Sequence, residues 1–165
     1  MNPLSQDLIR VACIGIGAPA AMDLWLLLLK RLKVPTLDFA LLGRWAAHAA
    51  RGRWRHQAIV RAAPVRGERA LGWLVHYAVG IAFAALLVAL VGPSWTREPR
   101  LLPALAVGLA TVAAPLFVLQ PAMGAGIAGS RTAMPLRNFL RSVANHAVFG
   151  FGLYLAALLL ERGVR

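Results

Sequence analysis

The stretch LIRVACIGIGAPAAMDLWLLLL, from Leu8 to Leu29, decides the fold class. It is one of four runs long enough to cross a bilayer, which takes about 20 mostly apolar residues. The other three runs are 70–91, 101–123 and 139–160. The runs are continuous and do not alternate with a period of two, so strands are not expected. We therefore predict an all-α polytopic membrane protein, a bundle of four transmembrane helices forming a single membrane domain over residues 1–165.

The composition agrees with a chain surrounded mainly by lipid. Of 165 residues, 59% are hydrophobic and 15% are charged, whereas a soluble domain carries about 25% charged residues. The high apolar fraction excludes a disordered chain, and the single cysteine, Cys13, excludes a disulfide framework or a Cys-based zinc site. The first run continues past Ala18-Pro19-Ala20 and lacks a basic leading region, so we expect a retained helix and not a cleaved signal peptide.

The basic residues predict the orientation in the membrane. The chain holds 18 Lys and Arg against 6 Asp and Glu, a net charge of +12. Thirteen of the basic residues fall in or beside the first and third connections between the predicted helices, and five fall on the other side. Because Lys and Arg mark the cytoplasmic side, we expect both termini to face outward. Trp95, in the short outer connection, suits the membrane interface.

The connection from Lys33 to Arg69 is predicted to be a basic amphipathic segment. Pro35 and Thr36 are expected to start a helix there, with Thr36 as the N-cap. Basic residues then recur with helical spacing on one face, at Arg44, His48, Arg51 and Arg55. We predict that the segment lies on the anionic inner leaflet of the bilayer, its lipid-surface residues being Arg44, Arg51, Arg55 and Trp45.

Other partners for this segment are a docking protein or a nucleic acid. No zinc finger, RNP-like stretch or other nucleic-acid motif is present, so no nucleic acid is expected. At 165 residues a lone bundle is small for a full transporter, and a homodimer is a reasonable assembly.

Polar side chains recur in the cytoplasmic half of the predicted helices. They are Asp23, His76, Gln120 and His146, with Asn145 beside His146. Asp23 lies seven residues before Lys30 and His76 seven after Arg69, each about 10 Å deep at 1.5 Å per residue. A charged group costs at least about 2.5–3.5 kcal/mol at the bilayer centre. We therefore expect these groups to face inward as one layer that binds a ligand or relays protons.

The chemistry of that layer stays open at this stage. Asp23, His76 and His146 are a possible metal set, and two histidines on facing helices could hold haem iron. Asp and His together could move protons or bind a small polar solute for transport or sensing. Alternatively, the layer only fixes helix packing, as in a structural or assembly subunit, because such hydrogen bonds average about 0.6 kcal/mol. No catalytic motif is present, so catalytic residues are not assigned and an enzyme is not favoured.

A short pattern recurs in the second and fourth runs. Gly72-x3-His76-x3-Gly80 returns seventy residues later as Ser142-x3-His146-x3-Gly150. Small residues four apart let membrane helices approach closely. We therefore expect both histidines to face a neighbouring helix.

Several longer runs resemble a known family. They include GAPAAMDLW from Gly17, LDFALLGRW from Leu37, GRWRH from Gly52, RGER from Arg66, LQPAMG from Leu119 and HAVFG from His146. Together they resemble small bacterial inner-membrane proteins catalogued only as a domain of unknown function. The resemblance implies a four-helix protein of a bacterial cytoplasmic membrane and no assigned activity. In such a membrane the charge rule predicts that both termini are periplasmic. Its pattern includes Asp23, His76, Gln120 and His146, and also the cytoplasmic Trp45, Arg53 and His56.

Overall fold

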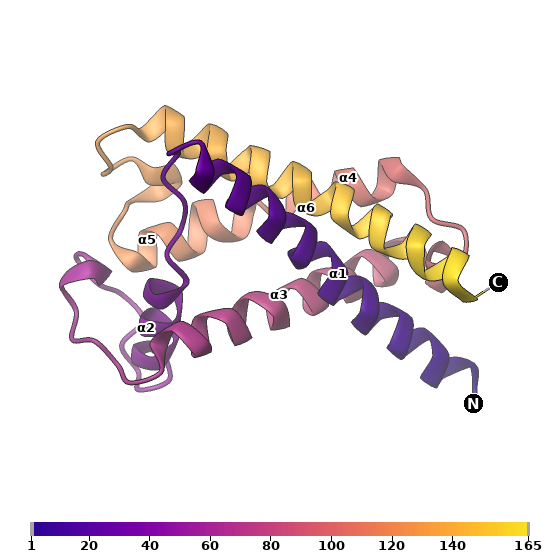
Figure 1. The fold of residues 1–165 in the computed structure, drawn as a ribbon. Coiled ribbons are helices and arrows are strands. Elements are labelled where there is room, and N and C mark those ends of the chain that lie inside the picture. The colour runs from indigo at the N-terminus through magenta and orange to yellow at the C-terminus, as the bar shows by residue number, and fades with distance from the viewer. Residues whose placement is uncertain (1, 165) are drawn as a thin grey trace. The chain divides into compact units, whose positions relative to one another are not determined.

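The computed structural model describes residues 2–164, which form helices joined by turns and loops, with no strand in that range. The longer helices are α1 (Pro3–Arg31), α3 (Glu68–Val91) and α6 (Pro135–Val164). Between them lie α2 (Phe39–Ala49), η1 (Ile59–Arg61), η2 (Pro93–Thr96), α4 (Leu101–Ala110), η3 (Ala114–Leu119), α5 (Gln120–Met123) and η4 (Ile127–Gly129). Figure 1 shows this order along the chain.

Four helical segments are long and apolar enough to cross a membrane. They are Leu4–Arg31, Glu68–Val91, Leu101–Met123 and Pro135–Gly163. The all-α prediction and the four apolar helices are therefore confirmed. The first helix begins earlier than its apolar run because the Asn2 side chain accepts the Ser5 N–H at 2.8 Å, which satisfies an otherwise free backbone donor.

The third apolar segment is broken, whereas the sequence predicted one continuous helix. Helix α4 ends at Ala110, and a π-helix follows from Ala114 to Leu119. The Thr111 hydroxyl donates to the Gly108 carbonyl at 2.6 Å, so a side chain competes for a helix carbonyl. Pro115 follows and has no N–H to donate. These two residues account for the change of helix type.

Helix α2 differs from its predicted form at both ends. It begins at Phe39, because Asp38 and not Thr36 is its N-cap and accepts the Ala40 N–H at 2.9 Å. It ends at Ala49. Arg51 and Arg55 therefore lie beyond the helix and do not share a helical face with Arg44 and His48, contrary to the spacing argument.

The chain forms two compact units. The first, here the helical unit, comprises Met1–Val34, Tyr77–Thr111 and Asn145–Arg165. The second, here the basic unit, comprises Pro35–His76 and Val112–Ala144. Two of the four boundaries fall within α3 and within α6, so each of these helices contributes residues to both units.

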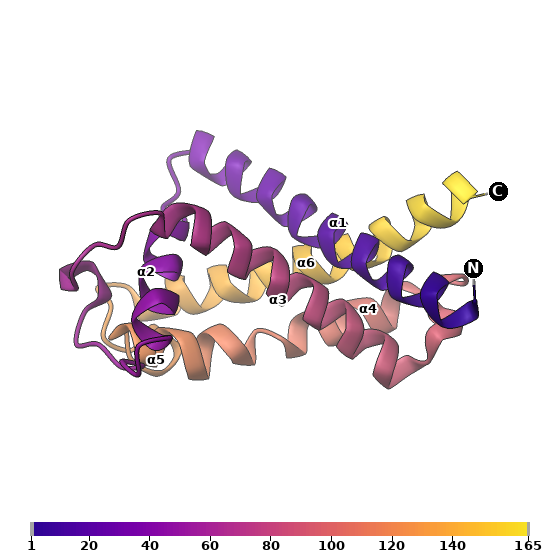
Figure 2. The same cartoon turned by 90° about the horizontal axis from the view of Figure 1, so that it is seen from below.

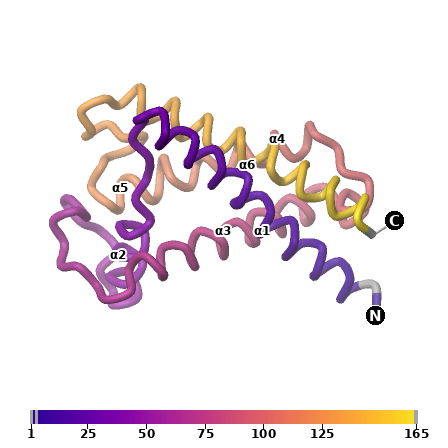
Figure 3. Tube along the Cα trace, in the orientation of Figure 1, coloured from indigo at the N-terminus to yellow at the C-terminus, as the bar shows by residue number. Residues whose placement is uncertain are grey.

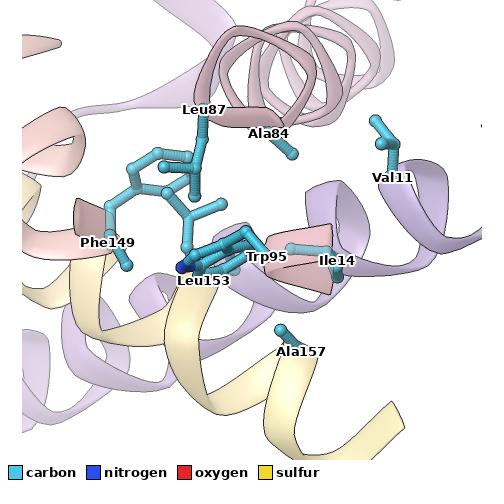
Figure 4. Packing of buried hydrophobic residues seen from close by; sticks show 10 residues of the cluster. Val11, Ile14, Ala84, Leu87, Trp95, Phe149, Leu153 and Ala157 are labelled. Carbon is cyan, nitrogen blue, oxygen red and sulfur yellow. The ribbon is translucent and has the colours of Figure 1, made fainter. Parts of the chain in front are cut away.

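The helical unit has an apolar core built from α1, α3, α4, α6 and the η2 turn. Leu87 and Leu153 are fully buried, and Ile14 and Trp95 are each 1% exposed. Figure 4 shows Trp95 among these core side chains. The ring of Trp95, which the sequence suggested for the membrane interface, lies in this core, and its Nε1 donates to the Arg100 carbonyl at 3.1 Å.

Glycines set how closely the helices of this unit approach. A Cβ on Gly80 would lie 2.3 Å from Pro19 Cγ, where α3 meets α1 (Figure 2). A Cβ on Gly108 would lie 2.3 Å from Gly150 Cα, where α4 meets α6. Real side chains cannot occupy such gaps, so these contacts require glycine. The prediction that Gly80 and Gly150 permit close helix packing is confirmed.

Candidate functional site

The residues predicted to form one polar layer are divided between the two units. Asp23, Asn145 and His146 belong to the helical unit, and His76 and Gln120 belong to the basic unit.

Asp23 joins α1 to α3 within the helical unit. The Tyr77 hydroxyl donates a hydrogen bond to Asp23 Oδ2 at 2.8 Å. Both side chains are half-buried. Since a carboxylate accepts but does not donate, the phenol supplies the complementary donor for Asp23.

Asn145 joins α6 to α1. Its Oδ1 accepts a hydrogen bond from Trp25 Nε1 at 3.0 Å. Trp25 lies two residues after Asp23 in α1, and both are half-buried. Trp25 was not predicted as a partner from the sequence, although its indole N–H is a polar donor within an apolar run.

His146 joins α6 to the end of α4. Its Nδ1 lies 2.9 Å from Thr111 Oγ1. The single hydroxyl hydrogen of Thr111 goes to the Gly108 carbonyl at 2.6 Å. The hydrogen in the bond between Thr111 and His146 must therefore be on His146 Nδ1, which donates to Thr111 Oγ1. The prediction that His146 faces a neighbouring helix is confirmed.

A second set of polar contacts joins α1 to α6 and to the η2 region at the other end of the helical unit. Arg10 forms an ion pair with Glu161 and donates to the Thr96 carbonyl at 2.9 Å. Arg97 pairs with Asp7 at 2.5 Å. Arg10 lies thirteen residues before Asp23 in α1, about 20 Å along the helix axis. The unit is therefore bonded at two levels with the apolar core between them.

In the basic unit, Gln120 contacts the first part of α6. Its Nε2 donates to Ser142 Oγ at 3.2 Å, and Ser142 Oγ donates to the Asn138 carbonyl at 3.1 Å. His76 lies in an aromatic cluster, its ring 4.6 Å from that of Phe39 and 5.9 Å from that of Trp73. Gln120 and Ser142, like the pairs above, join separate helical segments.

Metal binding requires several donors at one place. Within residues 2–164, no group of three or more His, Cys, Asp or Glu side chains is arranged to hold a metal ion. The proposed set of Asp23, His76 and His146 is therefore not found as such a cluster.

Arg44 organises the interior of the basic unit. It makes a two-pronged bond to Glu68, with Nε to Oε2 at 2.9 Å and Nη2 to Oε1 at 2.8 Å. Its Nη1 also donates to the Val60 and Ala62 carbonyls at 3.3 and 3.2 Å. The hydrogen bonds that Arg44 donates to Glu68 raise the pKa of Arg44. Predicted to lie on the lipid surface, the Arg44 side chain is 12% exposed and holds the η1 turn against α3.

The other three predicted lipid-surface residues differ from Arg44 and from one another. Arg51 and Arg55 are exposed. Trp45 is half-buried, and its Nε1 donates to the Trp54 carbonyl at 3.0 Å. Trp45 therefore helps to fix the loop that follows α2.

Two histidines meet beside that loop. His48 Nε2 lies 3.0 Å from the Ala63 carbonyl oxygen, and its ring packs edge-on against His56 at 5.2 Å. The backbone N–H of His56 donates to the Ala122 carbonyl at 2.8 Å. Burial lowers the pKa of His56, and the nearby charges of Arg53 and His48 lower it further. The lowered pKa favours the neutral form of the His56 ring.

Comparison with known proteins gives one match. A family model described as "Protein of unknown function (DUF2938)" matches residues 12–160. No curated protein matches the chain, and neither does any solved structure. The match covers the two units almost entirely, and it confirms the resemblance to a family known only as a domain of unknown function.

Proposed function

Because the chain belongs to this family of unknown function, its role has to be inferred from its own residues, and we propose a structural or assembly subunit. In this proposal the protein crosses a membrane four times. The polar side chains of its spans fix helix packing and do not carry a transported solute.

One observation carries the proposal. In the helical unit, Asp23, Asn145 and His146 each have a hydrogen-bond partner on a different helical segment. A solute site would instead need polar groups turned toward a cavity. Buried polar groups that are already hydrogen-bonded act as contacts between membrane helices.

The proposed topology places both chain ends outside and the basic unit inside. The basic unit contains ten Arg and two acidic residues, the bias that marks cytoplasmic segments. Within the helical unit, the described start of α1 and end of α6 lie at the same end (Figure 3). An even number of spans agrees with that arrangement.

Cysteine labelling tests the topology. A Cys13→Ala background has no other cysteine, so single cysteines can be added at Ser94 in η2 and at the exposed Arg66. In intact cells, a membrane-impermeant maleimide should label Ser94→Cys and leave Arg66→Cys unlabelled until the cells are opened. Labelling of Arg66→Cys in intact cells would refute the proposed orientation.

A proton relay is the second candidate, favoured by the direct bond between two ionisable groups, Asp23 and Tyr77. Asp23→Asn removes the ionisable group but retains an acceptor oxygen for the Tyr77 hydroxyl. In liposomes loaded with a pH-sensitive dye, a packing role predicts equal proton flux for wild type and Asp23→Asn. Proton flux that disappears in Asp23→Asn, with the protein still folded, would instead establish the relay.

The same preparations test for a cofactor. We expect no stoichiometric metal and no haem absorbance in detergent-purified protein. A metal or haem that is lost in His146→Ala would overturn the packing role.

A further inference from the structure

A cavity of about 600 Å³ opens in the basic unit. It is formed by the loop after α2 and by η1, and its lining is Arg53, Arg55, His56, Gln57, Ala58, Arg61 and Ala62. Its volume falls within the range of small-molecule sites. The lining contains three guanidinium groups and no acidic side chain. The cavity therefore has a strongly positive wall.

The positive charge of this wall is not neutralised by the basic unit itself. The two acids of the unit are Asp38 and Glu68. Asp38 caps α2 by accepting the Ala40 N–H, and Glu68 is bonded twice by Arg44. In the described part of the chain, none of the three cavity arginines forms an ion pair.

His56 is the second observation that points to a ligand. Its side chain lines the cavity but is only 8% exposed. Neither ring nitrogen has a hydrogen-bond partner among residues 2–164. An unsatisfied buried polar group costs about 1–3 kcal/mol, so such a group calls for an explanation. An acceptor oxygen placed in the cavity would satisfy it.

The cavity wall is fixed without a ligand. Arg44 holds η1 through the Val60 and Ala62 carbonyls. The His56 backbone is bonded to Ala122, and a Cβ on Gly124 would lie 2.1 Å from the Gln57 carbonyl oxygen. The loop therefore packs backbone to backbone on the end of α5. A site fixed in this way binds without a large ordering cost.

We propose that this cavity binds a phosphate group. Arg53, Arg55 and Arg61 hold its oxygens, and His56 donates a hydrogen bond to it. The planar guanidinium fork matches phosphate oxygens two at a time, and the absence of acids from the lining excludes a cation.

We assign this phosphate to the headgroup of an anionic lipid. Trp54, between two of the arginines, is 61% exposed, and Val60, beside the third, is 62% exposed. Exposed apolar side chains interleaved with arginines are typical of a surface at the lipid headgroup level. This assignment of the source rests on the proposed membrane location, whereas the phosphate chemistry does not.

Short-chain, water-soluble lipids test both parts on the full-length protein in a neutral detergent. The probes are dihexanoyl phosphatidic acid, dihexanoyl phosphatidylcholine and inorganic phosphate, with binding followed by thermophoresis of the labelled protein. The variants are Arg53→Gln/Arg61→Gln, the charge-preserving Arg53→Lys/Arg61→Lys, and Arg66→Gln as the matched control. Arg66 is an exposed arginine of the same unit outside the cavity lining.

We expect saturable binding of phosphatidic acid that is weakened about tenfold or more by the double Gln change, since charge-assisted hydrogen bonds are lost. The Lys pair should weaken it less, Arg66→Gln should leave it unchanged, and phosphatidylcholine should bind far more weakly. No saturable binding, or equal losses in the double Gln variant and Arg66→Gln, would overturn the site. Inorganic phosphate binding as tightly as phosphatidic acid would retain the phosphate site but overturn the lipid source.

These outcomes are separate from those of the topology experiment. Soluble lipids reach the cavity in detergent whichever way the protein is inserted. Thermal unfolding of each variant shows whether it is folded. If the double Gln variant is not folded, the Arg53→Lys/Arg61→Lys variant is compared with wild type instead. An unchanged affinity for phosphatidic acid in that variant would also count against the site.

Discussion

The Tyr77 hydroxyl donates a 2.8 Å hydrogen bond to the Asp23 carboxylate and thereby joins α3 to α1. Asp23 is one of six acidic residues in the chain and lies within an apolar helix. A charged group at such a position is costly without a partner. The bond shows how the helical unit accommodates it, and the other interhelical polar bonds of that unit follow the same principle.

Removing the Tyr77 hydroxyl should destabilise the protein. Tyr77→Phe takes away the donor and should lower the free energy of unfolding by about 1 kcal/mol, within the range for hydrogen bonds between membrane helices. Thermal unfolding in detergent measures the change. Tyr154→Phe is the control, because the hydroxyl of the half-buried Tyr154 makes no hydrogen bond within residues 2–164. Equal melting temperatures for the two variants would show that the Asp23 bond has no structural role.

Adding one methyl group at Gly108 should disrupt the contact between α4 and α6. In Gly108→Ala the new Cβ would lie 2.3 Å from Gly150 Cα, and overpacking of this kind costs about 1–3 kcal/mol. Gly163→Ala makes the same change on a helix where nothing lies within 4 Å. We expect a lower melting temperature for Gly108→Ala alone, and a matching loss in Gly163→Ala would contradict the packing shown here.

We expect stability to depend on Gly124 for two reasons, its close contact with the Gln57 backbone and its positive φ. Gly124 and Gly52 both have positive φ, +95° and +82°, but only at Gly124 would a Cβ meet another segment. Both Ala variants therefore share the backbone penalty. Gly124→Ala should lose about 1–3 kcal/mol more and should also weaken phosphatidic acid binding. If Gly52→Ala is equally damaging in thermal unfolding, the contact between Gly124 and Gln57 is not important.

His56 predicts how stability depends on pH. Its pKa is lowered from 6.5, chiefly by burial and then by Arg53 and His48, while the Ala122 carbonyl acts weakly in the opposite direction. Below pH 6.5 the unfolded chain then binds more protons than the native state, so stability falls as the pH decreases. Unfolding measured from pH 7.5 to 5.5 should show a steeper fall in wild type than in His56→Gln. Parallel slopes would contradict this role for His56.

Phosphate binding should respond to pH in the opposite direction. A bound anion favours the protonated His56 ring, so the affinity of wild type for phosphatidic acid should rise relative to that of His56→Gln as the pH falls. The same titration on His56→Gln should be flatter.

Length and hydropathy were sufficient to predict the four apolar helical segments, because both are local properties of the sequence. Helix ends and breaks were harder to predict. Thr36 and Asp38 are both good N-caps, and only the structure shows that Asp38 is used. The spacing of Arg51 and Arg55 suggested a longer helix, but Gly52, at a positive φ, follows the end of α2.

Partners were the part of the candidate site that the sequence did not reveal. Asp23, Asn145 and His146 could be picked out because polar groups are rare in apolar runs. Tyr77, Trp25 and Thr111 could not, because such amphipathic residues are common in membrane helices and lie 54, 120 and 35 positions from the residues that they bind. The partner of Arg44 was also not predicted. Its periodic spacing suggested a surface residue, but its bond to Glu68 keeps the side chain largely buried.

The central claim is that the polar residues of the candidate spans are packing contacts. A double-mutant cycle between Trp25 and Asn145 tests this claim most directly. Trp25→Phe removes the indole N–H that donates to Asn145 Oδ1 at 3.0 Å, and Asn145→Leu removes the acceptor at similar volume. The account predicts a coupling free energy of about 0.6 kcal/mol, and at most about 1.7 kcal/mol, in the unfolding of wild type, both single variants and the double variant. Additive losses with no coupling would contradict it.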